Sequence, residues 1–493
     1  MSDSLRDKTS AGVLWAFAER IGMQVVGFVV SVILARLLTP SDYGVIGMLT
    51  VFLSISQMFI DCGFGSALIR KKERTEEDFA TVFWYNLGIS CFCYLILFLA
   101  APLIADFYSM PILKSVLRVV GLNLIIHALY TIQVTRLTAL VNFSLQAKIT
   151  VSSNLVSGCI GITLAYCGYG VWALVGQTMS AAVFSGIMYW LFTGWRPRFL
   201  FSKKFFRELF GFGSKIMAAG FLHTIYMNIS PLIIGRKFSA ADLGYYSRGD
   251  SLAALPGGIF QSTLGRVIFP VLSSIQDDEA RLQRTYNKYL RIITSLVAPS
   301  MLLLAACAEP LIMLLIGEKW LPCVPYLQLL AIAWVCDPII LVNLNILYVK
   351  GRSDVVLKLE IIKKIIAILI VVIAVQYGVI WLCVGRVFYS YIALILNIRY
   401  CGPFLEMGFW RQIKEVKEIY ISGLLAAFLA FIIVQYTKGI FNIFGSITLN
   451  SLLRLIIAAV IGGFVYFVLA WIQKFDFIEE VRQFIKKRQR IEQ

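Results

Sequence analysis

Charged side chains inside long apolar runs are the residues of this sequence best able to do chemistry. Arg248 and Asp250 lie close together in one such run, and Arg266 follows about five helical turns after Arg248. That spacing places the two arginines on one face of a helix. Because a guanidinium group binds phosphate oxygens through a planar fork, the pair predicts a cavity for an anionic ligand. In the alternative interpretation, Arg248 pairs with Asp250, and Arg266 extends to the cytoplasmic surface.

Other charged residues in apolar runs have the same two interpretations, a polar cavity or a structural ion pair. The predicted substrate-binding cations of the cavity are Arg20, Arg118, Arg248, Arg266 and Lys215. A buried carboxylate can load and release a proton or hold Na⁺, so H⁺ or Na⁺ is the expected coupling ion. The candidates for this ion-coupling role are Glu19, Asp61, Asp250, Glu309 and Asp337. His127 and His223 could relay protons or form ordinary buried hydrogen bonds.

A short polar turn occurs twice, once in each half of the chain. It reads Arg36-Leu-Leu-Thr-Pro-Ser-Asp-Tyr-Gly44 and then Arg236-Lys-Phe-Ser-Ala-Ala-Asp-Leu-Gly244. Asp42 and Asp242 each precede an apolar run, where a carboxylate accepts from free backbone N–H groups at a helix start. The glycines permit close packing at the turn. The repeat predicts two copies of one membrane-embedded unit, an arrangement common in transporters.

The composition identifies a polytopic membrane protein. Of 493 residues, 59% are hydrophobic and 15% are charged, and the mean hydropathy is +0.80. Apolar runs and the loops between them predict an all-α protein with about 14 transmembrane helices, at about 20 residues per span. The first apolar run lacks the cleavage site of a signal peptide, so we expect it to be retained.

The spans group into two parallel six-helix lobes and two C-terminal helices. The predicted boundaries are 1–193 for the N-terminal lobe, 194–208 for a basic linker, 209–401 for the C-terminal lobe, 402–473 for the two additional helices and 474–493 for a basic tail.

The net charge of +17 reflects membrane topology and not a nucleic-acid partner. Lys and Arg concentrate in alternate loops, for example at Arg70, Lys71, Arg196 and Lys203, and the opposite loops carry few of them. By the positive-inside rule, the basic loops and both termini are cytoplasmic. The opposite connections are short, which leaves no room for an external catalytic domain.

Enzymatic chemistry is not indicated. The sequence contains no phosphate-binding loop, dinucleotide glycine signature or nucleophile elbow. The ten cysteines lie mostly within or beside apolar runs and show no metal-ligand spacing with the two histidines. We therefore expect no metal and no cofactor.

The repeated turn and several further segments resemble the MOP exporter superfamily, specifically its Wzx-type polysaccharide transporters, and most closely the colanic-acid exporter branch. The supporting segments are Asp61-Cys-Gly-Phe-Gly-Ser-Ala-Leu-Ile-Arg-Lys71, Ile275-Gln-Asp-Asp278, Gly317-Glu-Lys-Trp320 and Leu327-Gln-Leu-Leu330. The resemblance covers most of the chain and fades after about Gly402.

The resemblance implies flipping of an undecaprenyl-diphosphate-linked oligosaccharide across the bacterial inner membrane by alternating access. It also implies membrane lipids, a polysaccharide polymerase and chain-length machinery as partners. The alternative on the same fold is a drug or cation antiporter, which would favour a cavity with unpaired carboxylates. A glycosyl polymerase or ligase is the alternative from another class, and the short outer loops argue against it.

Overall fold

The computed structural model is helical, and its chain divides into two compact units, Met1–Gly244 and Tyr245–Gln493. The structure describes residues 22, 24–71, 74–140, 142–405, 407–440 and 447–478. Glu19 and Arg20 lie outside these residues, as does most of the predicted basic tail. Ten of the described helices are long and apolar enough to cross a membrane, which identifies an all-α multi-pass membrane protein. The count of fourteen spans stays a prediction.

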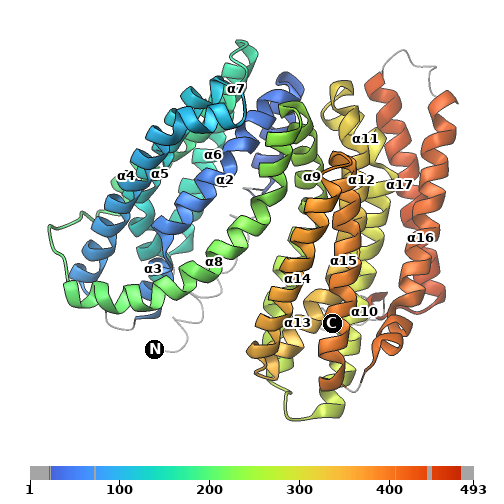
Figure 1. The fold of residues 1–493 in the computed structure, drawn as a ribbon. Coiled ribbons are helices and arrows are strands. Elements are labelled where there is room, and N and C mark those ends of the chain that lie inside the picture. The colour runs from blue at the N-terminus through green and yellow to red at the C-terminus, as the bar shows by residue number, and fades with distance from the viewer. Residues whose placement is uncertain are drawn as a thin grey trace, which may run out of the picture. The chain divides into compact units, whose positions relative to one another are not determined.

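The first unit contains a helix at Gln24–Leu37 and then the helices labelled α2 to α8 in Figure 1. Their bounds are α2 Pro40–Asp61, α3 Phe64–Arg70, α4 Glu76–Phe107, α5 Ile112–Ala139, α6 Phe143–Tyr166, α7 Val171–Phe192 and α8 Lys203–Lys237. Helix α8 packs against α2, and Gly213 and Gly220 permit this because they leave room for Cys62 and Met58. The first unit extends to Gly244. The predicted lobe and linker boundaries stay a prediction.

The second unit follows from Tyr245 and contains most of α9, which spans Ala240–Ser273. Its further helices are α10 Glu279–Ala306, α11 Ala308–Leu315, α12 Val324–Trp334, α13 Asp337–Val349, α14 Ser353–Ala374, α15 Val379–Cys401, α16 Phe409–Ile440 and α17 Ile447–Ile472. The C-terminal helix α16 packs along α10, where Leu290, Ile293, Val416 and Ile419 are almost fully buried. The two C-terminal helices thus belong to the core of the second unit.

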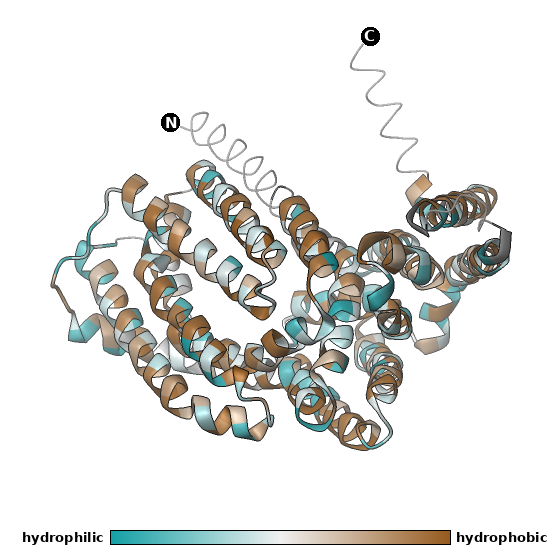
Figure 2. Ribbon diagram, turned by 90° about the horizontal axis from the view of Figure 1, so that it is seen from above, coloured by the Kyte–Doolittle hydropathy of each residue, from teal (hydrophilic) through white to brown (hydrophobic). Residues whose placement is uncertain are grey.

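The outward surface of the helices is apolar. Leu99, Leu103, Phe428 and Phe464 are each more than 60% exposed. Figure 2 shows hydrophobic residues along the long helices of the chain. Such exposure of large apolar side chains is unfavourable in water and is expected for side chains that face lipid.

Both repeated turns cap the helix that follows. Thr39 and Asp42 form a capping box at the start of α2: the Thr39 backbone N–H donates to the Asp42 carboxylate at 2.9 Å. Ser239 and Asp242 make the same contact at 3.1 Å at the start of α9. A Cβ atom at Gly44 would overlap the carbonyl oxygen of Ala240. The two turns therefore pack directly against each other through Gly44, and a Cβ at Gly244 would likewise overlap the carbonyl of Pro40.

The structure interrupts three apolar segments that the sequence predicts as single helices, 43–69, 290–316 and 324–348. Residues 43–69 form α2 and α3, because Cys62 and Gly63 adopt positive φ angles of 36° and 71° and end α2. Residues 290–316 divide at Cys307, between α10 and α11. Residues 324–348 form α12 and α13, which are separated at Val335 and Cys336. The first break places Asp61 at the end of α2, where its side chain borders a cavity.

Candidate functional site

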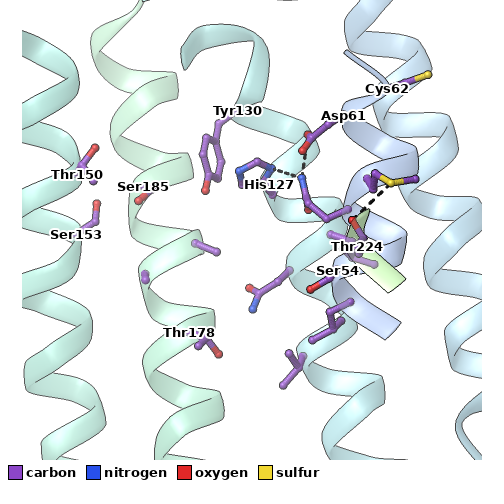
Figure 3. Close-up of a pocket in the computed structure, with 18 of the residues that line it drawn as sticks. Ser54, Asp61, Cys62, His127, Tyr130, Thr150, Ser153, Thr178, Ser185 and Thr224 are labelled. Atoms are coloured by element: carbon purple, nitrogen blue, oxygen red, sulfur yellow. Dashed lines mark hydrogen bonds between the residues drawn. The ribbon is translucent and has the colours of Figure 1, made fainter. Parts of the chain in front are cut away.

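The first unit contains an open cavity of about 880 Å³ between its helices, and its lining places polar side chains among apolar ones. Helices α2, α5, α6, α7 and α8 line it, and Figure 3 shows their side chains converging on one space. Its polar lining residues are Ser54, Gln57, Asp61, Asn123, His127, Tyr130, Thr150, Ser153, Asn154, Thr178, Ser185 and Thr224. Polar groups inside a membrane-spanning bundle are costly unless they serve a ligand or each other, so this cavity is the candidate site.

Three of the lining helices, α2, α5 and α6, each contribute a polar stripe with helical periodicity. On α2 the stripe is Ser54, Gln57 and Asp61, and on α5 the matching positions are Asn123 and His127 together with Tyr130. The stripe on α6 is Thr150, Ser153 and Asn154. The sequence analysis missed most of these residues because it searched for charges. Uncharged polar residues at i, i+3, i+4 and i+7 within an apolar run were the available signal.

A carboxylate, an amide and an imidazole form a hydrogen-bonded group on one wall (Figure 3). The Gln57 Nε2 amide donates to Asp61 Oδ1 at 3.0 Å and lies 3.3 Å from His127 Nδ1. One amide nitrogen carries two hydrogens, so it can donate to both groups when Nδ1 carries no proton. Thr131 Oγ1 also lies 3.0 Å from this Nδ1 and donates to the His127 carbonyl at 2.7 Å. Among the described residues, Asp61 is therefore held by a neutral amide donor and has no ion pair with an arginine or lysine.

The opposite wall presents hydrogen-bond acceptors. Thr150 donates its hydroxyl hydrogen to the Gln146 carbonyl at 2.8 Å, and Ser153 donates to Ile149 at 2.7 Å. Thr178 donates to carbonyls of its own helix at 2.9 and 3.1 Å. These bonds use the hydroxyl hydrogens and leave oxygen lone pairs available. Asn123 adds a buried carbonyl oxygen, Oδ1, that has no hydrogen-bond partner.

Among the described residues that line the cavity, none is lysine or arginine. Arg118 lies on α5 but packs its guanidinium over the ring of Phe98, 4.1 Å from the ring centre. Arg248 lies in the second unit, 6.0 Å from the ring centre of Trp320. The side chains of Lys215 and Arg266 are outside the described part of the structure. The substrate-binding role of these cations stays a prediction.

The other predicted ion-coupling carboxylates have different surroundings. Asp250 pairs with Arg386 at 3.0 Å. Glu309 accepts from Lys438 at 2.9 Å and lies 3.6 Å from Arg454, so it connects α11 to α16 and α17. Asp337 is the first residue of α13, a position where a carboxylate meets the positive end of the helix dipole. Only Asp61 of these described carboxylates borders the large cavity.

Comparison with known proteins assigns the family. The model of the family described as polysaccharide biosynthesis protein matches residues 33–325, which is more than half of the chain. The chain belongs to this polysaccharide biosynthesis family. The resemblance to Wzx-type transporters is thereby confirmed.

Two relatives and one solved structure are similar to this chain over most of its length. The succinoglycan biosynthesis transport protein ExoT of Rhizobium meliloti (strain 1021) is 27% identical over 95% of this chain and 94% of its own length. The lipopolysaccharide biosynthesis protein WzxC of Escherichia coli (strain K12) is 25% identical over 80% of this chain and 81% of its own. The structure of the lipid II flippase MurJ in an inward closed conformation matches with a TM-score of 0.75 and 17% identity over 94% of this chain and all of MurJ. The family member therefore shares the MurJ fold.

Proposed function

We propose that this protein flips an undecaprenyl-diphosphate-linked oligosaccharide repeat unit from the cytoplasmic to the outer leaflet of the bacterial inner membrane, for surface polysaccharide biosynthesis. A polar cavity within apolar helices, in a chain of the polysaccharide biosynthesis family, is the observation that carries this proposal. The names of the relatives support it, since ExoT is a transport protein of succinoglycan biosynthesis and MurJ is a lipid II flippase. Both termini face the cytoplasm, as the distribution of basic residues indicates.

The protein acts as a transporter and not as an enzyme. Alternating access exposes a polar cavity to one side of the membrane at a time, so the sugars cross without contacting hydrocarbon. A polysaccharide polymerase and its chain-length machinery would use the flipped unit at the outer surface, and they are the expected partners.

The driving ion in this proposal is a proton, with Na⁺ as the alternative. Asp61 supports the proton because it borders the cavity and is held by Gln57, beside the imidazole of His127. A carboxylate paired with an arginine stays charged, whereas a carboxylate held by an amide can load and release a proton.

The test is a gene deletion combined with lipid analysis. Deletion should abolish the surface polysaccharide and accumulate the lipid-linked repeat unit on the cytoplasmic side, and the wild-type gene should reverse both effects. In proteoliposomes, the purified protein should make the lipid-linked repeat unit accessible to external periodate, which does not cross membranes. Normal surface polysaccharide after deletion, together with no flipping in proteoliposomes, would contradict the proposal.

A drug or cation antiporter is the second candidate, because one carboxylate, Asp61, borders the cavity. The two functions predict different phenotypes for a deletion strain. An antiporter deletion would raise sensitivity to cationic drugs and leave the surface polysaccharide intact.

A further inference from the structure

The cavity of the first unit is rich in hydrogen-bond acceptors and, in its described lining, lacks cationic side chains. The acceptors are the Asp61 carboxylate, the unpartnered Asn123 Oδ1 and the hydroxyl oxygens of Thr150, Ser153 and Thr178, whose hydrogens are already donated to backbone carbonyls. The lining also offers neutral donors, among them the Asn123 amide, the Tyr130 hydroxyl and the His127 imidazole, so a ligand that fits it is neutral and both donates and accepts hydrogen bonds.

A diphosphate does not meet this requirement. It is an anion, so in this cavity it would face the Asp61 carboxylate without a lysine or arginine from the described lining. Removing such an anion from water without a partner carries a large free-energy cost.

A neutral sugar meets the requirement. Each sugar hydroxyl can donate to one of the lining oxygens and accept from another group, and hydroxyls carry no net charge that Asp61 would repel. Tyr130 adds an aromatic ring to the lining, fixed by stacking on Tyr189 with ring centres 5.4 Å apart. The volume of about 880 Å³ lies within the range of about 300–1,000 Å³ of small-ligand sites.

We propose that the cavity of the first unit is a glycan subsite that binds a neutral sugar segment of the transported oligosaccharide, and that the diphosphate is held outside it. The proposal rests on the function proposed above and deepens it. The acceptor groups on α6 and α7 then select the substrate by its sugars. A glycan that leaves a buried acceptor without a donor binds with a less favourable free energy.

The test compares two matched double variants. Thr150→Val with Thr178→Val removes two cavity hydroxyls and keeps the side-chain shape. Thr163→Val with Thr193→Val is the control. Thr163 lies in α6 and Thr193 directly follows α7, both donate to a carbonyl of the adjoining helix, and neither lines the cavity.

Three probes separate the parts of the substrate. They are the undecaprenyl-diphosphate-linked repeat unit purified from the deletion strain, undecaprenyl diphosphate alone, and the free oligosaccharide released from the first probe by mild acid. Affinities are measured by native mass spectrometry of the full chain in nanodiscs. We expect the cavity double variant to bind both glycan-containing probes about tenfold more weakly or worse, with unchanged binding of undecaprenyl diphosphate. The control variant should match the wild type with all three.

The other outcomes contradict either the subsite or the proposed function. Equal weakening toward undecaprenyl diphosphate, unchanged binding of both glycan probes, or no binding of the free oligosaccharide to the wild type would overturn the subsite. If the wild type binds the free oligosaccharide but moves no lipid-linked repeat unit, the proposed function fails and the subsite stands. If thermal melting shows that the double variant is misfolded, Ser185→Ala and Asn123→Leu provide the same comparison at single positions.

Discussion

At the scale of single residues, the surroundings of each acidic group separate the coupling candidates. Asp250 pairs with Arg386, and Glu309 pairs with Lys438. Asp61 instead accepts from Gln57 and lies beside the cavity. A group that must gain and lose a proton during transport needs such neutral surroundings and access to water.

Asp61→Asn tests proton coupling. The groups that face Asp61 from the packed helices are Gln57 and His127, and the described lining from α6, α7 and α8 adds hydroxyls and amides without a charge. The wild type should flip its substrate faster when a proton gradient is imposed on proteoliposomes, and Asp61→Asn should flip at the rate without a gradient. Asp106→Asn, at an exposed carboxylate near the end of α4, is the control and should respond as the wild type does. An Asp61→Asn protein that still responds fully to the gradient would exclude Asp61 as the coupling group.

At the scale of elements, small residues and charge clusters decide how the helices meet. Gly44 allows the start of α2 to touch the backbone at Ala240. Glu309 instead connects α11 with α16 and α17, through ion pairs with Lys438 and Arg454. Both features concern packing, and neither borders the cavity.

Gly44→Ala should destabilise the protein. The added methyl group would overlap the carbonyl oxygen of Ala240, and forcing extra volume into a packed contact costs about 1–3 kcal/mol. Gly88→Ala is the matched control, because it also lies within a helix and a Cβ there would meet nothing within 4 Å. Thermal unfolding in detergent should show a lower midpoint for Gly44→Ala alone. Equal midpoints for the two variants would show that the turns are not closely packed.

Glu309→Ala should also lower the unfolding midpoint while leaving gradient-driven flipping per folded molecule unchanged. Arg454, whose side chain is 10% exposed, loses a carboxylate partner in this variant and keeps its bond to the Val434 carbonyl; breaking a buried ion pair costs about 3–5 kcal/mol. Asp354→Ala removes an exposed pair with Arg352 in the same unit and should change the midpoint little. Loss of the gradient response with unchanged stability would instead assign Glu309 to ion coupling.

At the scale of the whole molecule, the distribution of basic residues predicts how the chain is oriented in the membrane. By the positive-inside rule we expect the basic loops on the cytoplasmic side and the turn between α6 and α7 outside. Cys167 begins this turn and its thiol is free and exposed.

Labelling of intact cells tests this topology. A maleimide that does not cross membranes should modify Cys167 from outside, and mass spectrometry of the peptides identifies the site. A cysteine placed at Ser353, beside Arg352 at the start of α14, should react only after the cells are permeabilised. The reverse pattern would invert the orientation and place both termini outside.

The sequence by itself determined the membrane class, the repeated caps and the family resemblance. These properties depend on local composition, on helical periodicity and on short segments whose spacing does not require the fold. The capping pairs Thr39 with Asp42 and Ser239 with Asp242 are local contacts of this kind.

Only the tertiary structure decided which polar residues meet. A charged side chain is costly in hydrocarbon, so the sequence points to Asp61 and, as a titratable group, to His127. The hydroxyls of α6 and α7 carry no charge and were missed. Asn123, Thr150 and Thr178 lie on three different helices, and no local pattern in any one of them specifies that all three face the same cavity. Side-chain convergence depends on how helices pack and rotate against each other, through contacts such as Gly220 with Met58, and these are distant in the sequence.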